Sequence, residues 1–103
     1  MQEFQFLNYQ IKSPIAEIII NRPPINAFNI QLLDEILSAL ELAKNDKTIK
    51  AVLIKSNLEK IFCAGLDLDI LIDKPILKVR EFLERLYVKL WDIQYNMGKP
   101  TIA

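Results

Sequence analysis

The sequence predicts an α/β fold, and three observations support this class. Two short runs, Ile15–Ile20 and residues 51–54, are almost entirely apolar, as in strands that are buried on both faces of a sheet. The segment between them, from residue 29 to about residue 44, carries apolar residues at helical spacing. A second helical pattern begins near residue 75 and stops before residue 97. The predicted order is therefore strand, strand, helix, strand, loop and helix.

A further strand is predicted near the amino terminus. Apolar residues stand at positions 4 and 6 and then at positions 9 and 11, so the alternation changes parity at residues 7–8. This change predicts a bulge or break in the strand. Ser13-Pro14 predicts a turn, and the Pro23-Pro24 pair ends the next strand because proline cannot donate a hydrogen bond to a sheet.

Both helices carry recognisable end signals. Asn29 can cap the first helix, because its side chain can accept a hydrogen bond from a free amide of the first turn. Pro75 suits a first-turn position of the second helix, and Gly98 suits its carboxyl cap. The apolar face of the first helix is predicted to consist of Leu33, Ile36, Leu37, Leu40 and Ala43.

The composition excludes several classes of function. The 103 residues include 13 basic and 13 acidic side chains, so no net charge attracts nucleic acid or an anionic membrane. No apolar run reaches the roughly 18 residues that a membrane-spanning helix needs, and the first residues do not resemble a signal peptide. The chain has no histidine, which excludes a Ser-His or Cys-His pair and most zinc sites. We therefore expect no nucleic-acid or membrane partner.

Cys63 is the single cysteine, so it cannot form an internal disulfide. A reducing compartment, the cytoplasm, is the plain interpretation. The residue has no histidine partner and no obvious cationic neighbour in sequence. Because a nucleophilic thiol needs a lowered pKa, we interpret Cys63 as a buried and inert thiol.

The alternating carboxylates Asp67, Asp69 and Asp73 resemble a calcium-binding loop. However, Leu71 and Ile72 stand where such a loop needs an oxygen ligand and a glycine. No metal site is therefore predicted.

Gly65 is one of only two glycines and lies between a predicted strand and the second helix, within Phe62-Cys63-Ala64-Gly65-Leu66-Asp67-Leu68. Glycine has no Cβ, so it allows the backbone to turn or to approach another group closely. The amide after such a glycine can point into open space, as an oxyanion-hole donor does. Spacing alone leaves a simple loop glycine as the alternative.

Two motifs together resemble the enoyl-CoA hydratase/isomerase family, the crotonase superfamily. They are N-R-P-P-I-N-A-F at residues 21–28 and F-C-A-G-L-D-L at residues 62–68, separated by a helix and a buried strand. K-P-T-I-A at residues 99–103 resembles the family segment that leads into the next strand. The resemblance covers nearly the whole chain but only the amino-terminal part of a family member. It implies that residues 1–103 form about two ββα units of a crotonase-like spiral, ending before the second oxyanion-hole turn.

The resemblance implies a thioester site. The backbone amide of Leu66 would donate to the acyl-CoA thioester oxygen. Coenzyme A would then be part of the substrate, and no separate cofactor is expected. Arg22 could reach a phosphate of coenzyme A, but we favour a structural or solvated arginine. The residues implied in coenzyme A or substrate binding are Pro24, Ile25, Ala27, Ala64, Gly65, Leu66, Asp67 and Leu68.

The implied reaction is proton removal or water addition next to a thioester, with the enolate held by two amides and protons moved by carboxylates. In the family the second amide and the carboxylates come later in the chain, so residues 1–103 alone are not expected to turn over. The tight turn at residues 23–26 and the leucine after Gly65 resemble Δ3,Δ2-enoyl-CoA isomerases. Enoyl-CoA or dienoyl-CoA hydratases are the alternative, and a non-catalytic fragment or acyl-CoA-binding module is the second alternative.

Tyr87, Trp91 and Tyr95 recur every four residues on the second predicted helix. This pattern is more typical of packing than of a functional site, and a contact between subunits is the alternative. The family resemblance implies trimers, often paired into hexamers. An unpaired sheet edge and apolar helix faces would also favour self-association, so we expect a homo-oligomer.

Overall fold

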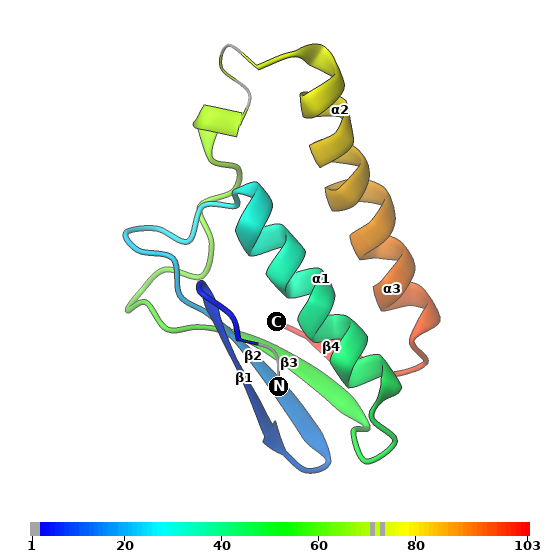
Figure 1. Ribbon diagram of the computed structural model, residues 1–103. Helices are drawn as coiled ribbons and strands as arrows, with labels where there is room; N and C mark the ends of the chain where they lie inside the picture. Colours follow the sequence, from blue (N-terminus) through cyan, green and yellow to red (C-terminus); the bar gives the residue numbers. More distant parts are fainter. Residues whose placement is uncertain (1–2, 71, 73) are drawn as a thin grey trace.

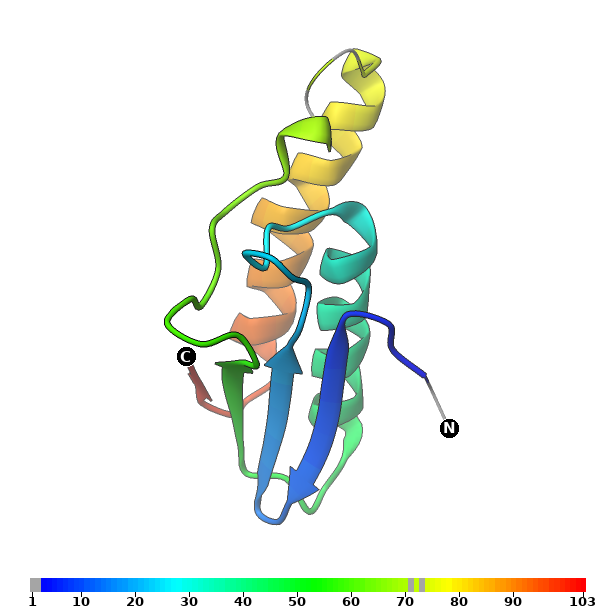
Figure 2. The same ribbon diagram turned by 90° about the vertical axis from the view of Figure 1, so that its left-hand side faces the viewer.

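The computed structural model describes residues 3–70, 72 and 74–103. Leu71 and Asp73, from the calcium-like pattern, lie outside the described residues. The described part forms a four-stranded sheet in the order β1-β2-β3-β4, with the helices on one side of it (Figures 1 and 2). This architecture confirms the predicted α/β class. The strands are β1 (Leu7–Lys12), β2 (Ile15–Ile20), β3 (Ala51–Ser56) and β4 (Thr101–Ile102).

β1 and β2 form an antiparallel hairpin with continuous register from Leu7 opposite Ile20 to Lys12 opposite Ile15. The predicted bulge or break within the first strand was wrong, because the strand begins at Leu7 itself. Phe6 lies before the strand, and its amide donates to the Glu35 carboxylate on the first helix at 2.7 Å. The change in the alternation of apolar residues at residues 7–8 therefore marks the point where the chain enters the sheet.

β3 runs parallel to β2, with Ala16 opposite Val52, and β4 runs parallel to β3. The predicted adjacency of the two apolar strands is confirmed. Burial on both faces of β2 is only partly confirmed, because no helix covers the face that carries Glu17. There the Glu17 carboxylate lies 3.4 Å from the Lys12 ammonium and 3.6 Å from the Lys55 ammonium. These two lysines offset the cost of burying the charge.

α1 (Ile30–Asn45) begins at the predicted cap, where the Asn29 Oδ1 accepts a hydrogen bond from the Leu32 amide at 2.8 Å. Leu37, predicted on the apolar face, is only half-buried at its edge. At the other end of α1, the Lys99 ammonium donates to three main-chain oxygens, those of Ala43, Lys44 and Asp46. The residues that α1 buries are Leu32, Leu33, Ile36, Ala39, Leu40 and Ala43.

The predicted second helix consists of α2 (Ile76–Glu84) and α3 (Leu90–Asn96), joined without a break by the π-helical turn η2 (Arg85–Lys89). Gly98 has φ +72° just past the helix end, as expected of a C-cap glycine. The helices lie side by side with α1, and the α2 end extends beyond the sheet (Figures 1 and 2). Among the described residues, only the α3 half of this long helix therefore reaches the hydrophobic core between the sheet and α1. It does so through Leu90 and Ile93, and Met97 just after the helix also belongs to this core.

The three aromatic residues at four-residue spacing do not pack inside the chain, so that interpretation was wrong. Tyr87, Trp91 and Tyr95 are 69%, 68% and 76% exposed. The rings of Trp91 and Tyr95 stack on each other with their centroids 6.3 Å apart. A contact between subunits is the remaining interpretation.

Candidate functional site

The loops that follow β2 and β3 lie together at the carboxyl ends of these two parallel strands (Figure 2). They are joined by a parallel bridge between Phe28 and Leu66. The Phe28 amide donates to the Gly65 carbonyl at 2.7 Å, and the Asp67 amide donates to the Phe28 carbonyl at 2.9 Å. Sheet topology thus brings the two sequence motifs into direct contact.

Gly65 has φ +94°, in the region that residues with a side chain rarely adopt. A Cβ placed on this residue would meet no atom within 4 Å. The requirement for glycine therefore comes from the backbone conformation and not from a lack of space. This conformation turns the chain into the short extended segment that contains Leu66.

The Leu66 amide is directed away from the bridge to Phe28. Successive residues of an extended segment direct their N–H groups to opposite sides, and here the neighbouring Gly65 and Asp67 make the bonds to Phe28. No acceptor for the Leu66 amide occurs among the described residues. The Leu66 side chain packs against the cluster around Leu33 and Phe82. A free amide on an apolar support has the properties that an oxyanion donor needs.

Arg22 ties the two loops together by charge. Its Nη2 lies 3.0 Å from the Asp67 Oδ2, and its Nη1 donates to the Ala27 carbonyl at 2.8 Å. The guanidinium also lies over the Phe6 ring, 5.5 Å from its centroid. The pKa of Asp67 is lowered, first by the hydrogen bond from the Asp69 amide and then by Arg22. These contacts support the interpretation of Arg22 as a structural residue.

The sequence predictions did not include Asn26, which is completely buried between the loops. Its backbone has φ +54°, a conformation that asparagine tolerates better than most residues. Its side chain bonds to the loop after β2, to Ser56 at the end of β3 and to the Phe62 carbonyl. The sequence signal was weak, because an asparagine after two prolines is also common in exposed turns.

All the predicted coenzyme A and substrate residues lie on the two joined loops and are at least partly exposed. Ile25 is 42% exposed and Leu68 is 66% exposed, so both apolar side chains are accessible. Cys63 is half-buried, and the Gly65 amide lies 3.4 Å from its Sγ. The prediction of a buried thiol is therefore only partly confirmed, because Cys63 packs against the hydrophobic core but keeps some exposed surface. The predicted residues placed here are Pro24, Ile25, Ala27, Ala64, Gly65, Leu66, Asp67 and Leu68.

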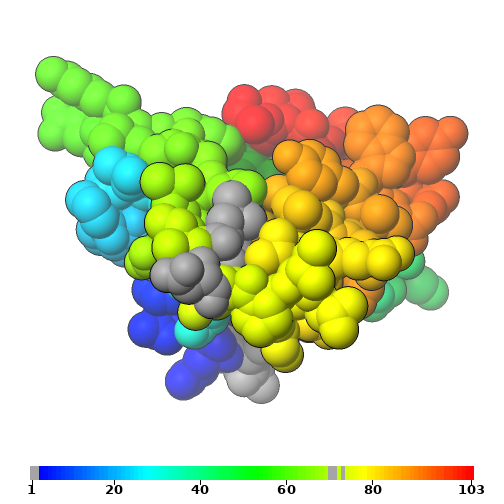
Figure 3. Space-filling model, turned by 90° about the horizontal axis from the view of Figure 1, so that it is seen from above, coloured from blue at the N-terminus to red at the C-terminus, as the bar shows by residue number. Residues whose placement is uncertain are grey.

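A depression of about 600 Å³ adjoins these loops. Figure 3 shows this end of the molecule, where the segment after β3 (yellow-green) lies between the loop after β2 (light blue) and α2 (yellow). Lys74 and Lys78 add positive charge beside the Arg22–Asp67 ion pair. The lining residues are Arg22, Asn29, Ile30, Gln31, Asp67, Asp69, Lys74 and Lys78.

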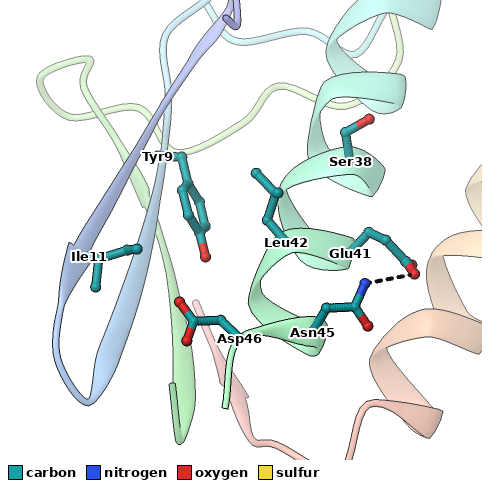
Figure 4. A pocket seen from close by; sticks show the side chains of 7 residues that line it. All are labelled: Tyr9, Ile11, Ser38, Glu41, Leu42, Asn45 and Asp46. Atoms are coloured by element: carbon teal, nitrogen blue, oxygen red, sulfur yellow. Dashed lines mark hydrogen bonds between the residues drawn. The ribbon is translucent and has the colours of Figure 1, made fainter. Parts of the chain in front are cut away.

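A second depression, of about 480 Å³, lies between β1 and the end of α1 (Figure 4). The Tyr9 hydroxyl is buried there without a hydrogen-bond partner among the described residues and points toward Asp46. Burial and then the charge of Asp46 raise the pKa of Tyr9. None of the predicted site residues lines this depression.

Among residues 3–70, 72 and 74–103, no group of three or more His, Cys, Asp or Glu side chains is placed to hold a metal ion. No helix in the same part of the chain is both long enough and apolar enough to cross a membrane.

Comparisons with known proteins agree with this geometry. A sequence profile of the enoyl-CoA hydratase/isomerase family matches residues 10–103. The trans-2-decenoyl-[acyl-carrier-protein] isomerase of Streptococcus mutans is 39% identical over 67 residues, which are 64% of this chain and 25% of that protein. The mitochondrial enoyl-CoA delta isomerase 1 of Rattus norvegicus is 41% identical over 54 residues, which are 52% of this chain and 19% of that protein.

A solved structure described as a putative enoyl-CoA hydratase/isomerase (crotonase) from Legionella pneumophila matches with a TM-score of 0.85 and 29% identity. The match covers 96% of this chain and 39% of that one. The fold is therefore the α/β crotonase fold. The chain belongs to the enoyl-CoA hydratase/isomerase family, and its matches span a quarter or less of the two curated relatives named above.

Proposed function

We propose that this chain supplies the part of an enoyl-CoA-processing enzyme that binds an acyl thioester and holds its carbonyl oxygen with the Leu66 amide. The observation that carries the proposal is the Leu66 amide, which has no acceptor among the described residues and which the bridge between Phe28 and the Gly65–Asp67 segment directs away from Phe28. A fixed N–H donor on an apolar support stabilises negative charge that develops on a thioester oxygen.

The two loops are proposed to bind the coenzyme A part of the substrate. The adenine end is proposed to lie against residues 64–68, which are at least partly exposed, and Pro24, Ile25 and Ala27 lie on the adjoining loop. The lysines of the neighbouring depression, Lys74 and Lys78, suit the phosphates of coenzyme A. Coenzyme A enters as part of the substrate, and we propose no resident cofactor.

The proposed chemistry is stabilisation of a thioester enolate during isomerisation. Both curated relatives named above are isomerases, which favours an isomerase over an enoyl-CoA or dienoyl-CoA hydratase. The nearest carboxylate in sequence, Asp67, is paired with Arg22 and has a lowered pKa, which makes it a poor proton carrier. We therefore propose that the isolated chain binds a thioester without turning it over.

A non-catalytic acyl-CoA-binding module is the second candidate. The same observation favours it, because the Leu66 amide can hold a carbonyl oxygen while the neighbouring carboxylate, Asp67, is paired with Arg22. Self-association is proposed from the exposed aromatic residues on η2 and α3. A reducing compartment, the cytoplasm, is proposed from the free thiol of Cys63.

The test is an NMR titration of the ¹⁵N-labelled chain with butyryl-CoA and, separately, with coenzyme A, which lacks the thioester carbonyl. We expect amides of residues 64–68 to respond to both compounds and the Leu66 amide to shift further with butyryl-CoA. An equal Leu66 response to both compounds would contradict the proposal. Incubation with 3-hexenoyl-CoA and 2-hexenoyl-CoA should give no product, and turnover of either would contradict the proposed inactivity.

A further inference from the structure

Asn26 uses every polar group of its side chain inside the protein. It has no exposed surface. Its Oδ1 accepts a hydrogen bond from the Arg22 amide at 2.6 Å. Its Nδ2 donates to the Ser56 Oγ and to the Phe62 carbonyl, each at 2.9 Å. A single amide group thus joins the loop after β2, the end of β3 and the loop that leads to Gly65.

Asn26 also lies close to the backbone hydrogen bonds that join the loops after β2 and β3. One residue before it, the Ile25 carbonyl accepts a hydrogen bond from the Ala64 amide at 3.1 Å. Two residues after it, Phe28 forms the bridge to Leu66. Asn26 therefore lies between the two points at which the loops bond to each other. A rotation of the backbone at Asn26 would therefore displace one bonding point relative to the other.

Asparagine suits this position for two separate reasons. Its backbone adopts φ +54°, and its side chain carries one acceptor and two donors. Aspartate has nearly the same shape but lacks the two N–H donors. Glycine adopts the backbone conformation with no strain but has no side chain. These two substitutions therefore separate the hydrogen-bond network from the backbone requirement.

We infer that Asn26 is a positioning residue for the Leu66 amide. It fixes the loop after β2 against β3 and against Phe62, and Phe28 in turn sets the direction of the Gly65–Asp67 segment. The relevance of Asn26 to thioester binding rests on the proposed function. The way in which the two loops are held against each other can be measured without any ligand.

The experiment compares Asn26→Asp and Asn26→Gly with Asn57→Asp and Asn57→Gly in the complete 103-residue chain. Asn57 is an exposed asparagine of the next loop, and in the described part of the chain only its backbone amide is bonded, to the Ile20 carbonyl. Hydrogen exchange is measured for the bridging amides of Phe28 and Asp67 and for the β2–β3 ladder. The response of the Leu66 amide to butyryl-CoA is then recorded by NMR for each variant.

Both Asn26 variants should speed exchange of the Phe28 and Asp67 amides by about tenfold or more, while the β2–β3 ladder keeps its protection. Their Leu66 response to butyryl-CoA should be weakened, and the Asn57 variants should match the unmodified chain. Unchanged exchange of the bridging amides in both Asn26 variants would overturn the inference. If the unmodified chain does not bind butyryl-CoA, the proposed function fails, but the exchange result still decides the role of Asn26 in loop register.

If the Asn26 substitutions also speed hydrogen exchange in the β2–β3 ladder, a milder variant is used. Ser56→Ala removes one acceptor of the network and leaves Asn26 in place. It should speed exchange of the Phe28 and Asp67 amides by a few-fold with the ladder protected. No effect of Ser56→Ala on those amides would then count against the inference.

Discussion

The guanidinium of Arg22 lies 3.0 Å from the carboxylate of Asp67, and this ion pair joins the loops that follow β2 and β3. Both side chains are about three-quarters buried, with 23% and 22% exposed. The pair lies beside the segment that carries the Leu66 amide. Its charge state is therefore expected to affect how firmly the loops hold together.

The first prediction concerns pH. The pKa of Asp67 is lowered in the folded chain, so its stabilising contribution is present above the ordinary aspartate pKa and is lost as the pH falls through the folded value. Below about pH 4, the free energy of unfolding should fall more steeply in the unmodified chain than in Asp67→Asn. Urea unfolding between pH 3 and pH 6 measures the difference, with Asp69→Asn as the exposed control. Parallel curves for the unmodified chain and Asp67→Asn would contradict the prediction.

The second prediction concerns Gly65. Gly65→Val should destabilise the chain by about 1–2 kcal/mol or more, because a β-branched residue resists the left-handed backbone. It should also abolish the Leu66 response to butyryl-CoA, whereas Leu66→Ala keeps the amide and should retain that response. In a complete family enzyme, the loss of one oxyanion donor should lower turnover by about 10²–10³-fold. If a folded Gly65→Val chain kept an unchanged Leu66 response to butyryl-CoA, this loop would not provide the oxyanion donor.

The third prediction concerns Lys99, whose ammonium lies 2.8 Å from the Asp46 carbonyl and 3.2 Å from the Lys44 carbonyl. Lys99→Met should lower the free energy of unfolding by about 1–3 kcal/mol, because it leaves the last carbonyls of α1 without this charged donor. Lys47→Met, at an exposed lysine, is the matched control. Equal unfolding midpoints for the two variants would show that the contact contributes little.

The fourth prediction concerns the buried hydroxyl of Tyr9, which has no hydrogen-bond partner among the described residues. Tyr9→Phe should leave the free energy of unfolding unchanged or raise it by up to about 1 kcal/mol, because a buried polar group without a partner is unfavourable. Thermal or urea unfolding measures the change. A clear loss of stability would mean that the hydroxyl makes a favourable contact in solution.

The fifth prediction concerns assembly. The exposed, stacked rings of Trp91 and Tyr95 should support self-association, which light scattering detects as a mass above 11.9 kDa at high concentration. Trp91→Lys combined with Tyr95→Lys should shift the chain toward the monomer, and Asn96→Lys is the control at a neighbouring exposed position. A monomeric unmodified chain at high concentration would contradict this expectation.

Local patterns predicted most of the elements. The apolar run at Ile15–Ile20, the cap at Asn29 and the position of Gly98 each depend on chemistry within a few residues, and all three are in the structure as predicted. The start of β1 was misplaced because it depends on a distant partner, the Glu35 carboxylate that bonds to the Phe6 amide. A parity pattern contains no information about such a contact.

By itself, the sequence determined the α/β class, the family motifs and the presence of a glycine at residue 65, whose required backbone conformation only the structure showed. These properties follow from side-chain periodicity and from the backbone freedom of single residues. Only the tertiary structure decided that Asn26 and Arg22 would join the two loops and that the Leu66 amide would be directed away from Phe28. The reason is physical, because hydrogen bonds between residues far apart in sequence exist only after parallel pairing of β2 and β3 brings their following loops to the same edge of the sheet.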